Sequence, residues 1–202
     1  MISDKSLKRA IKTAVKHGGC NAWFEDIRGN VNFWCDDWCV VTDHVNMRDH
    51  LREVMGYIVE MLGYIPQRPV KIGKANSEYI EIGMLAEVAE AEVNGFLGGG
   101  LERVARLPLH WRGHALWMSE RYRIYGIDEG APSCMCKVNY INGNGCITAV
   151  DEDADEGVYI RCFDKDHREG REWDELRHLE TFEWFELPKD EMDQMEMEDE
   201  DE

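Results

Sequence analysis

The stretch VNFWCDDWCVVTD (residues 31–43) decides most of the expected fold. Two runs rich in aromatic and β-branched residues flank Asp36 and Asp37, and the similar run CNAWFEDI (residues 20–27) precedes them. Runs of this kind, separated by turn residues, are typical of short β-strands. Residues 20–43 are therefore predicted to form an antiparallel meander.

Two cysteines make the same stretch a candidate metal site. Cys35 and Cys39 are separated by three residues, a spacing that zinc sites use, and His44 and His50 follow as further candidate ligands. The residues around both thiols are mostly apolar or aromatic, however, and free cysteine is commonly buried in such surroundings. We therefore favour a hydrophobic hairpin over a metal site, and we expect no cofactor.

Helices are predicted on both sides of the meander, over about 4–17 and 47–62, which gives an N-terminal α-β-meander-α unit. The first helix is amphipathic, with apolar side chains along one side and cations along the other. The cationic side is an anion-facing ridge of five residues: Lys5, Lys8, Arg9, Lys12 and Lys16. A solvated outer face is the more common interpretation of such a ridge. The alternative is that it faces nucleic acid or the acidic tail of the same chain.

Two further helices are predicted over about 78–95 and 109–124, which gives a central helical segment. The helix over 78–95 is apolar or small at most positions and is expected to be covered on most sides. Glu92 falls on its apolar side, where we expect it to pair with an arginine, Arg103 or Arg106, and where a functional carboxylate is the alternative.

Two motifs of the central segment are candidates for a phosphate-binding or a metal-binding site. Gly98–Gly100 are interpreted as a flexible connection between helices, because a phosphate-binding turn would require a preceding strand. His110 and His114 have the spacing of the paired ligands in helical zinc metalloproteases, but Trp111 stands where the general-base glutamate would be. No hydrolase activity is assigned on this basis.

The last third of the chain changes character. Residues 128–188 contain short strand-like runs separated by polar turns, and NGNG (residues 142–145) is a strong hairpin signal. We expect a small antiparallel β-barrel or bent sheet there, SH3-like by analogy of strand spacing alone. Residues 189–202 hold nine acids in fourteen positions and are predicted to be a disordered acidic tail. An α+β domain is predicted over residues 1–127, before these two segments. The predicted fold class of the whole chain is α+β.

Charge is distributed unevenly along the chain. The net charge is +2 over residues 1–75, −2 over 76–127 and −18 over 128–202, so the last segment equals the total of −18. Such a field repels free nucleic acid and anionic membranes and attracts basic surfaces. No apolar run approaches the roughly 18 residues of a membrane span, and no signal peptide is evident. A cytoplasmic protein is therefore expected.

These observations predict a non-enzymatic acidic interaction protein that binds and occludes a basic surface of a partner, including one that itself binds nucleic acid. The charge profile is similar to that of small acidic inhibitors that phages make against host nucleases, a likeness of charge that no residue motif supports. The predicted partner-binding residues are Asp151, Glu152, Asp153, Asp155, Glu156, Trp173, Asp174, Glu175 and Trp184. The alternative is an enzyme or ligand-binding protein whose site uses His110, His114, Glu92 or Gly98–Gly100. The oligomeric state is left open.

Overall fold

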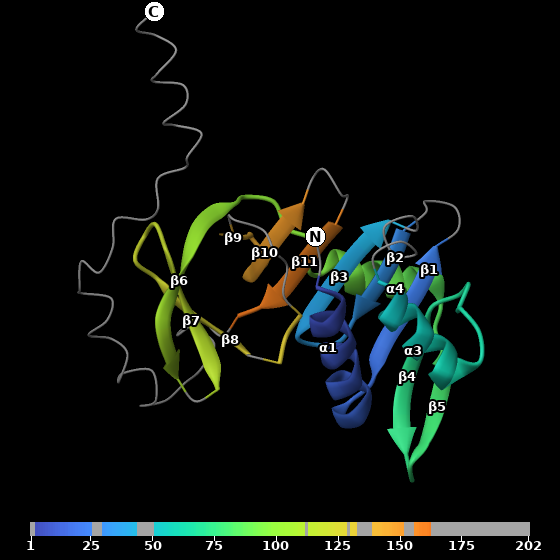
Figure 1. Cartoon of the computed structure of the whole chain (residues 1–202). Coiled ribbons are helices and arrows are strands. Elements are labelled where there is room, and N and C mark those ends of the chain that lie inside the picture. Colours follow the sequence, from blue (N-terminus) through green and yellow to red (C-terminus); the bar gives the residue numbers. More distant parts are fainter. Residues whose placement is uncertain are drawn as a thin grey trace, which may run out of the picture.

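A single open antiparallel sheet dominates the structure (Figure 1). The computed structural model describes residues 3–25, 30–43, 51–111, 113–128, 130–132, 139–151 and 156–162. Within these residues the sheet has eleven strands and is accompanied by three helices. None of these helices is long and apolar enough to cross a membrane.

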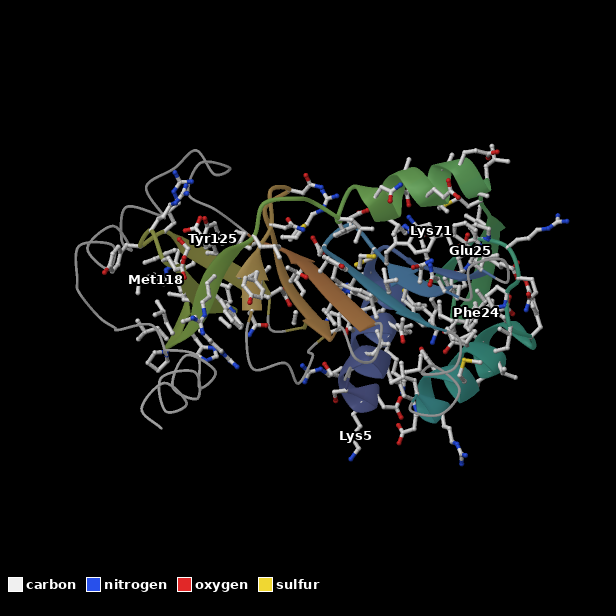
Figure 2. The ribbon with its side chains drawn as sticks, turned by 90° about the horizontal axis from the view of Figure 1, so that it is seen from above. Lys5, Phe24, Glu25, Lys71, Met118 and Tyr125 are labelled. Carbon is white, nitrogen blue, oxygen red and sulfur yellow. The ribbon has the colours of Figure 1, made fainter. Side chains whose placement is uncertain are left out.

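The strands follow one another across the sheet in an order that differs from their order in the chain. This order is β5 (Glu78–Gly83), β4 (Val70–Ala75), β1 (Cys20–Glu25), β2 (Asn30–Trp34), β3 (Trp38–Asp43), β11 (Glu156–Arg161), β10 (Cys146–Asp151), β9 (Asn139–Ile141), β6 (Glu102–Trp111), β7 (His114–Ser119) and β8 (Ile124–Asp128). The helices are α1 (Asp4–His17), α3 (Arg52–Leu62) and α4 (Ala86–Asn94). Figure 2 shows α1 and α3 on one side of the sheet and α4 on the other.

The N-terminal predictions agree with the structure. β1, β2 and β3 form the meander expected over 20–43, with antiparallel pairs such as Ala22 with Phe33. α1 coincides with the helix predicted over 4–17, and it buries Leu7 and Ile11 against the sheet as its periodicity requires. α3 accounts for the described part of the helix predicted over 47–62.

The helix predicted over 78–95 is wrong in its first half. Residues 78–83 form β5, which pairs with β4 through a tight two-residue turn at Asn76 and Ser77. Both turn residues have positive φ, 49° and 71°, which matches the twist of a hairpin. Ser77 is therefore a turn residue directly before the strand. α4 is also not a covered central helix, since only its Ala89 and Val93 are buried.

The helix predicted over 109–124 is wrong as well. Residues 102–119 form the β6–β7 hairpin, which turns next to Gly113 at φ 81°. β8 then pairs with β7. The apolar residues of this segment pack on the sheet, where Leu107, Leu116 and Met118 belong to a buried cluster.

The predicted separate β-barrel is also wrong. The strands expected to form it, β9, β10 and β11, lie in the middle of the one sheet (Figure 1). β11 pairs with β3, placing Val158 opposite Val40, and β9 pairs with β6. The hairpin predicted at residues 142–145 is confirmed, because it joins β9 to β10. The domain boundary after residue 127 stays a prediction, and residues 163–202 lie outside the described part.

The largest buried cluster lies between the sheet and the helices α1 and α3. At its centre the rings of Phe24 and Phe33 meet edge to face, with centroids 5.9 Å apart. A smaller cluster lies under α4, where Trp23 and Trp34 pack against Ala89 and Val93 of the helix. The sheet is therefore covered on both sides at β1 and β2, and the helices place their outward residues on opposite faces.

Candidate partner-binding surface

The two cysteines of the candidate metal site pack against different clusters. Cys39 is buried in the cluster under α4, whereas Cys35 lies against the cluster under α1 and α3. Burial raises the pKa of both thiols, which keeps them protonated at neutral pH. Among the described residues no group of three or more potential metal ligands is present. His44 and His50 lie outside the described residues.

The two histidines of the central segment occupy opposite faces of a β-ribbon. His114 pairs with Trp111 across the β6–β7 hairpin, and His110 pairs with Ala115. Paired residues share a face, and successive residues in a strand alternate between faces. His110 and His114 therefore point away from each other, whereas a helix would have placed them together. This arrangement does not support His110 and His114 as two ligands of one metal ion.

Glu92 is held by residues of β1 and β2. Its Oε2 accepts a hydrogen bond from Trp34 Nε1 at 2.6 Å and one from Asn21 Nδ2 at 3.4 Å. The predicted arginine partners, Arg103 and Arg106, lie on β6, several strands away. Trp34 and Asn21 are both buried, so the carboxylate satisfies donors that would otherwise be costly to bury. Glu92 thus anchors α4 to the sheet.

The glycine-rich segment after α4 packs against the β9–β10 turn. It joins a helix to a strand, not a helix to a helix as predicted. Asn142 Nδ2 donates to Phe96 O at 2.8 Å, and Gly143 N donates to Gly99 O at 2.9 Å. Asn144 Nδ2 donates to Leu97 O at 2.9 Å. Close approach of the two backbones explains the glycine at position 98, and a positive φ of 75° explains the one at position 100.

Alanine at position 98 is expected to be destabilising, while alanine at position 99 is not. In Gly98→Ala the new Cβ would lie 2.9 Å from the backbone N of Asn144, so we expect the free energy of unfolding to fall by about 1–3 kcal/mol. In Gly99→Ala the Cβ would meet no atom within 4 Å, and the change should stay within about 0.5 kcal/mol. Urea denaturation measures both, and equal effects would contradict the packing described.

The cationic ridge on α1 is directed in part toward α3. Lys8 Nζ lies 3.4 Å from Glu53 Oε2, and Lys12 Nζ lies 5.0 Å from the centre of the Tyr57 ring. Lys5 and Lys16 are exposed. Lys8 and Lys12 therefore already have partners within the protein, which weakens the ridge as a site for an external anion. Its role in binding stays a prediction.

Of the predicted partner-binding residues, two fall in described strands. Asp151 and Glu156 are the facing end residues of the β10–β11 hairpin. Their role in partner binding stays a prediction. The remaining predicted residues, Glu152, Asp153, Asp155, Trp173, Asp174, Glu175 and Trp184, lie outside the described residues.

A surface with exposed apolar side chains, which the sequence-based predictions did not include, is formed by β5 and the start of α4. Four large apolar side chains there are unusually exposed: Ile80 (43%), Ile82 (61%), Leu85 (70%) and Val88 (44%). Residues 75–102 contain six glutamates and no lysine, arginine or histidine. We call Glu78, Ile80, Ile82, Leu85 and Val88 the α4–β5 surface.

Strand register places the β5 residues of this surface on the face that carries α4. Ile82 pairs with Lys71, and Lys71 pairs with Asn21, whose side chain contacts Glu92 of α4. Paired residues share a face, so Ile82 and, by alternation, Ile80 and Glu78 lie on that face. Figure 2 shows Lys71 on this side of the sheet and Phe24 on the side of α3.

The prediction of a helix over 78–95 hid this surface, because it assigned Ile82 and Leu85 to a covered helix. Two signals could have revealed it: the alternation of Glu78, Ile80 and Ile82, and the lack of cations over 75–102. No model of a known protein family, no curated protein and no solved structure matches this chain. The functional argument therefore depends on the surface and the charge distribution.

Proposed function

We propose that this protein is a non-enzymatic acidic interaction protein that binds and occludes a basic surface of a partner protein. The observation that carries the proposal is the α4–β5 surface, where exposed apolar side chains lie in a stretch of chain with glutamates and no cations. The chain has a net charge of −18, and residues 128–202 alone also have a net charge of −18. This charge adds a long-range attraction for the same kind of partner.

The two components of this surface contribute differently to binding. A contiguous exposed apolar patch marks an interaction site, because burying it in a complex removes it from water. The surrounding carboxylates accelerate the encounter with a basic partner and disfavour acidic ones. A basic surface that itself binds nucleic acid would be occluded in the same way, since the acidic protein occupies the positions of the phosphates.

The alternative function is an enzyme or ligand-binding protein with a central site. Its candidate residues do not lie together in the described structure. His110 and His114 face opposite ways, and Glu92 is bonded to Trp34 on a strand far from β6. The glycines at 98–100 contact the β9–β10 turn. Glu92 and the glycine segment therefore have structural roles, and the two histidines do not lie on one face.

Charge reversal at Glu78 of the α4–β5 surface and at the neighbouring Glu87, in the first turn of α4, is expected to reduce salt-sensitive retention of basic proteins strongly. The test immobilises the full chain, the double variant Glu78→Lys with Glu87→Lys, and a chain lacking residues 189–202, and exposes each to cell lysate. The full chain should retain basic proteins at low salt and release them above about 0.5 M salt, where screening shortens to about 4 Å. The double variant should retain much less.

A matched control is Glu120→Lys, which changes an exposed acidic residue at the far end of the sheet, next to β7. Its retention should stay close to that of the unchanged chain. The chain without residues 189–202 separates the contribution of the tail from that of the folded surface. Retention that is indifferent to salt and to the double charge reversal would refute the proposed function.

A further inference from the structure

The outer edge of β5 is an open strand edge. Along the described part of the chain β5 is the last strand at one end of the sheet and β8 the last at the other. Ile124–Ile127 of β8 are all buried, whereas five of the six residues of β5 are exposed. The two ends of the sheet therefore differ, and the edge of β5 is the accessible one.

The hydrogen-bond pattern shows which β5 residues face outward. Met84 N donates to Pro69 O at 2.9 Å, so residues 84 and 69 form a hydrogen-bonded pair of the antiparallel ladder. Because such pairs alternate along a ladder, Ile82 and Ile80 direct their backbone groups toward β4. Tyr79, Glu81 and Gly83 then direct their backbone N–H and C=O groups away from the sheet.

Of the features by which proteins usually protect an exposed strand, β5 has the charges of Glu78 and Glu81 but lacks the others. β5 contains no lysine and no proline, and its six consecutive pairs with β4 show no bulge. Exposed apolar side chains, Ile80 and Ile82, lie on one face directly beside it. An edge of this kind is a template for pairing with a further strand.

We propose that an extended segment of the partner, with apolar residues on one face and a basic residue beside Glu81 on the other, pairs with β5 as an additional strand of the sheet. The inference rests on the proposed function and specifies how the partner is bound. Backbone hydrogen bonds to Tyr79, Glu81 and Gly83 provide the pairing. The side chains of the added strand then alternate between the two faces of the sheet.

The two faces beside β5 determine the chemistry of the added strand. On the face with α4 its side chains lie beside Ile80 and Ile82, which favours apolar residues. On the other face one of its side chains lies beside Glu81, whose Oε1 accepts a hydrogen bond from Tyr64 Oη at 2.5 Å. A basic residue is favoured there. A basic residue is not favoured beside Tyr79, because Lys74 Nζ already lies 5.3 Å from the centre of the Tyr79 ring.

A second copy of this chain is a poorer occupant of the same edge. Pairing of two β5 strands would bring Glu78 and Glu81 of one copy close to those of the other, and like charges across a strand pair are destabilising. Each copy also carries a net charge of −18. A basic segment from a different protein satisfies both the backbone edge and the charge.

Amide hydrogen exchange of the full chain tests the pairing directly. The probe is a ten-residue synthetic peptide of alternating lysine and valine. Without it, the amides of Ile80 and Ile82 should be protected and those of Tyr79, Glu81 and Gly83 should exchange quickly. With saturating peptide the latter three should become protected. Binding without this protection would overturn strand pairing, as would protection of the three amides by dimerisation of the chain alone.

A matched pair of variants provides the second readout. Glu81→Pro removes both the carboxylate and an outward N–H, whereas Glu81→Gln removes the carboxylate alone, and proline is tolerated on an edge strand. We expect the proline variant to bind the peptide at least about tenfold more weakly than the glutamine variant, as loss of a hydrogen bond implies. If Glu81→Pro does not fold, the exchange pattern of the unchanged chain decides.

The outcomes separate this inference from the proposed function. Equal affinities of the two variants, with binding that remains sensitive to salt, would overturn strand pairing and leave the acidic interaction protein standing. Absence of any salt-sensitive binding, of the peptide and of basic proteins from lysate, would remove both. A tenfold difference together with protection of Tyr79, Glu81 and Gly83 supports the inference.

Discussion

Replacing Val158 by aspartate (Val158→Asp) is expected to lower the free energy of unfolding by about 4 kcal/mol or more, the effect of burying an unpaired charge. Val158 lies on β11 and is 1% exposed, inside the cluster under α1 and α3. It pairs with Val40 of β3. One carboxylate on the last described strand of the chain should therefore unfold the N-terminal part of the molecule.

Chemical denaturation measures the loss, and hydrogen exchange of the amides in β1, β2 and β3 shows where it acts. The matched control is Val59→Asp, since Val59 is a valine of α3 that is 43% exposed, and its replacement should cost little. If β11 belonged to an independent small domain, Val158→Asp would leave protection in β1–β3 unchanged. That result would contradict the single sheet.

Replacing Phe33 by alanine (Phe33→Ala) is expected to lower the free energy of unfolding by about 3–5 kcal/mol. Phe33 is fully buried between the sheet and the helices α1 and α3, and its ring meets Phe24 edge to face. Alanine would remove the apolar contacts and leave a cavity that the surrounding sheet cannot close. Urea or thermal denaturation of the purified variant measures the change.

A double-mutant cycle with Phe24→Ala separates the ring contact from the cavity. The coupling between the two positions should be about 0.5–1.5 kcal/mol, as for other aromatic pairs. The control is Leu101→Ala, because Leu101 is a large apolar residue that is 60% exposed and should tolerate truncation. A Phe33→Ala effect no larger than that of Leu101→Ala would contradict the core as described.

Elements with clear local signals were predicted correctly. α1 has an amphipathic repeat, and Ser3 Oγ accepts a hydrogen bond from Ser6 N at its start. The meander has strand-like runs separated by turn residues, and the Asn-Gly sequence at 142–145 predicted a hairpin that is present. In each case residues close in the sequence contain the whole structural signal.

The central elements were mispredicted because their composition fits more than one structure. Residues 78–83 alternate between exposed faces of an edge strand, yet their apolar and acidic residues also fit a helix. The turn at Asn76 and Ser77 requires two positive φ angles without the glycine that usually signals it. The apolar residues within 109–118 likewise suit either a helix or a strand hairpin.

The sequence alone was a partial guide to the candidate site. The excess of acid near the C-terminus was evident from counting charges. The α4–β5 surface was not, because exposure of Ile82 and Leu85 depends on where β5 ends the sheet. Glu92 was recognised as unusual, but its partners, Trp34 and Asn21, come from strands distant in the sequence.

By itself the sequence determined the amphipathic first helix, the meander and the uneven charge, because periodicity, turn residues and charge are properties of neighbouring residues. Only the tertiary structure decided that β11 joins β3, that β9 joins β6 and that β5 is left at an open edge. Strand pairing over long separations depends on which edges and apolar faces fit together in space, and a local pattern does not record that fit.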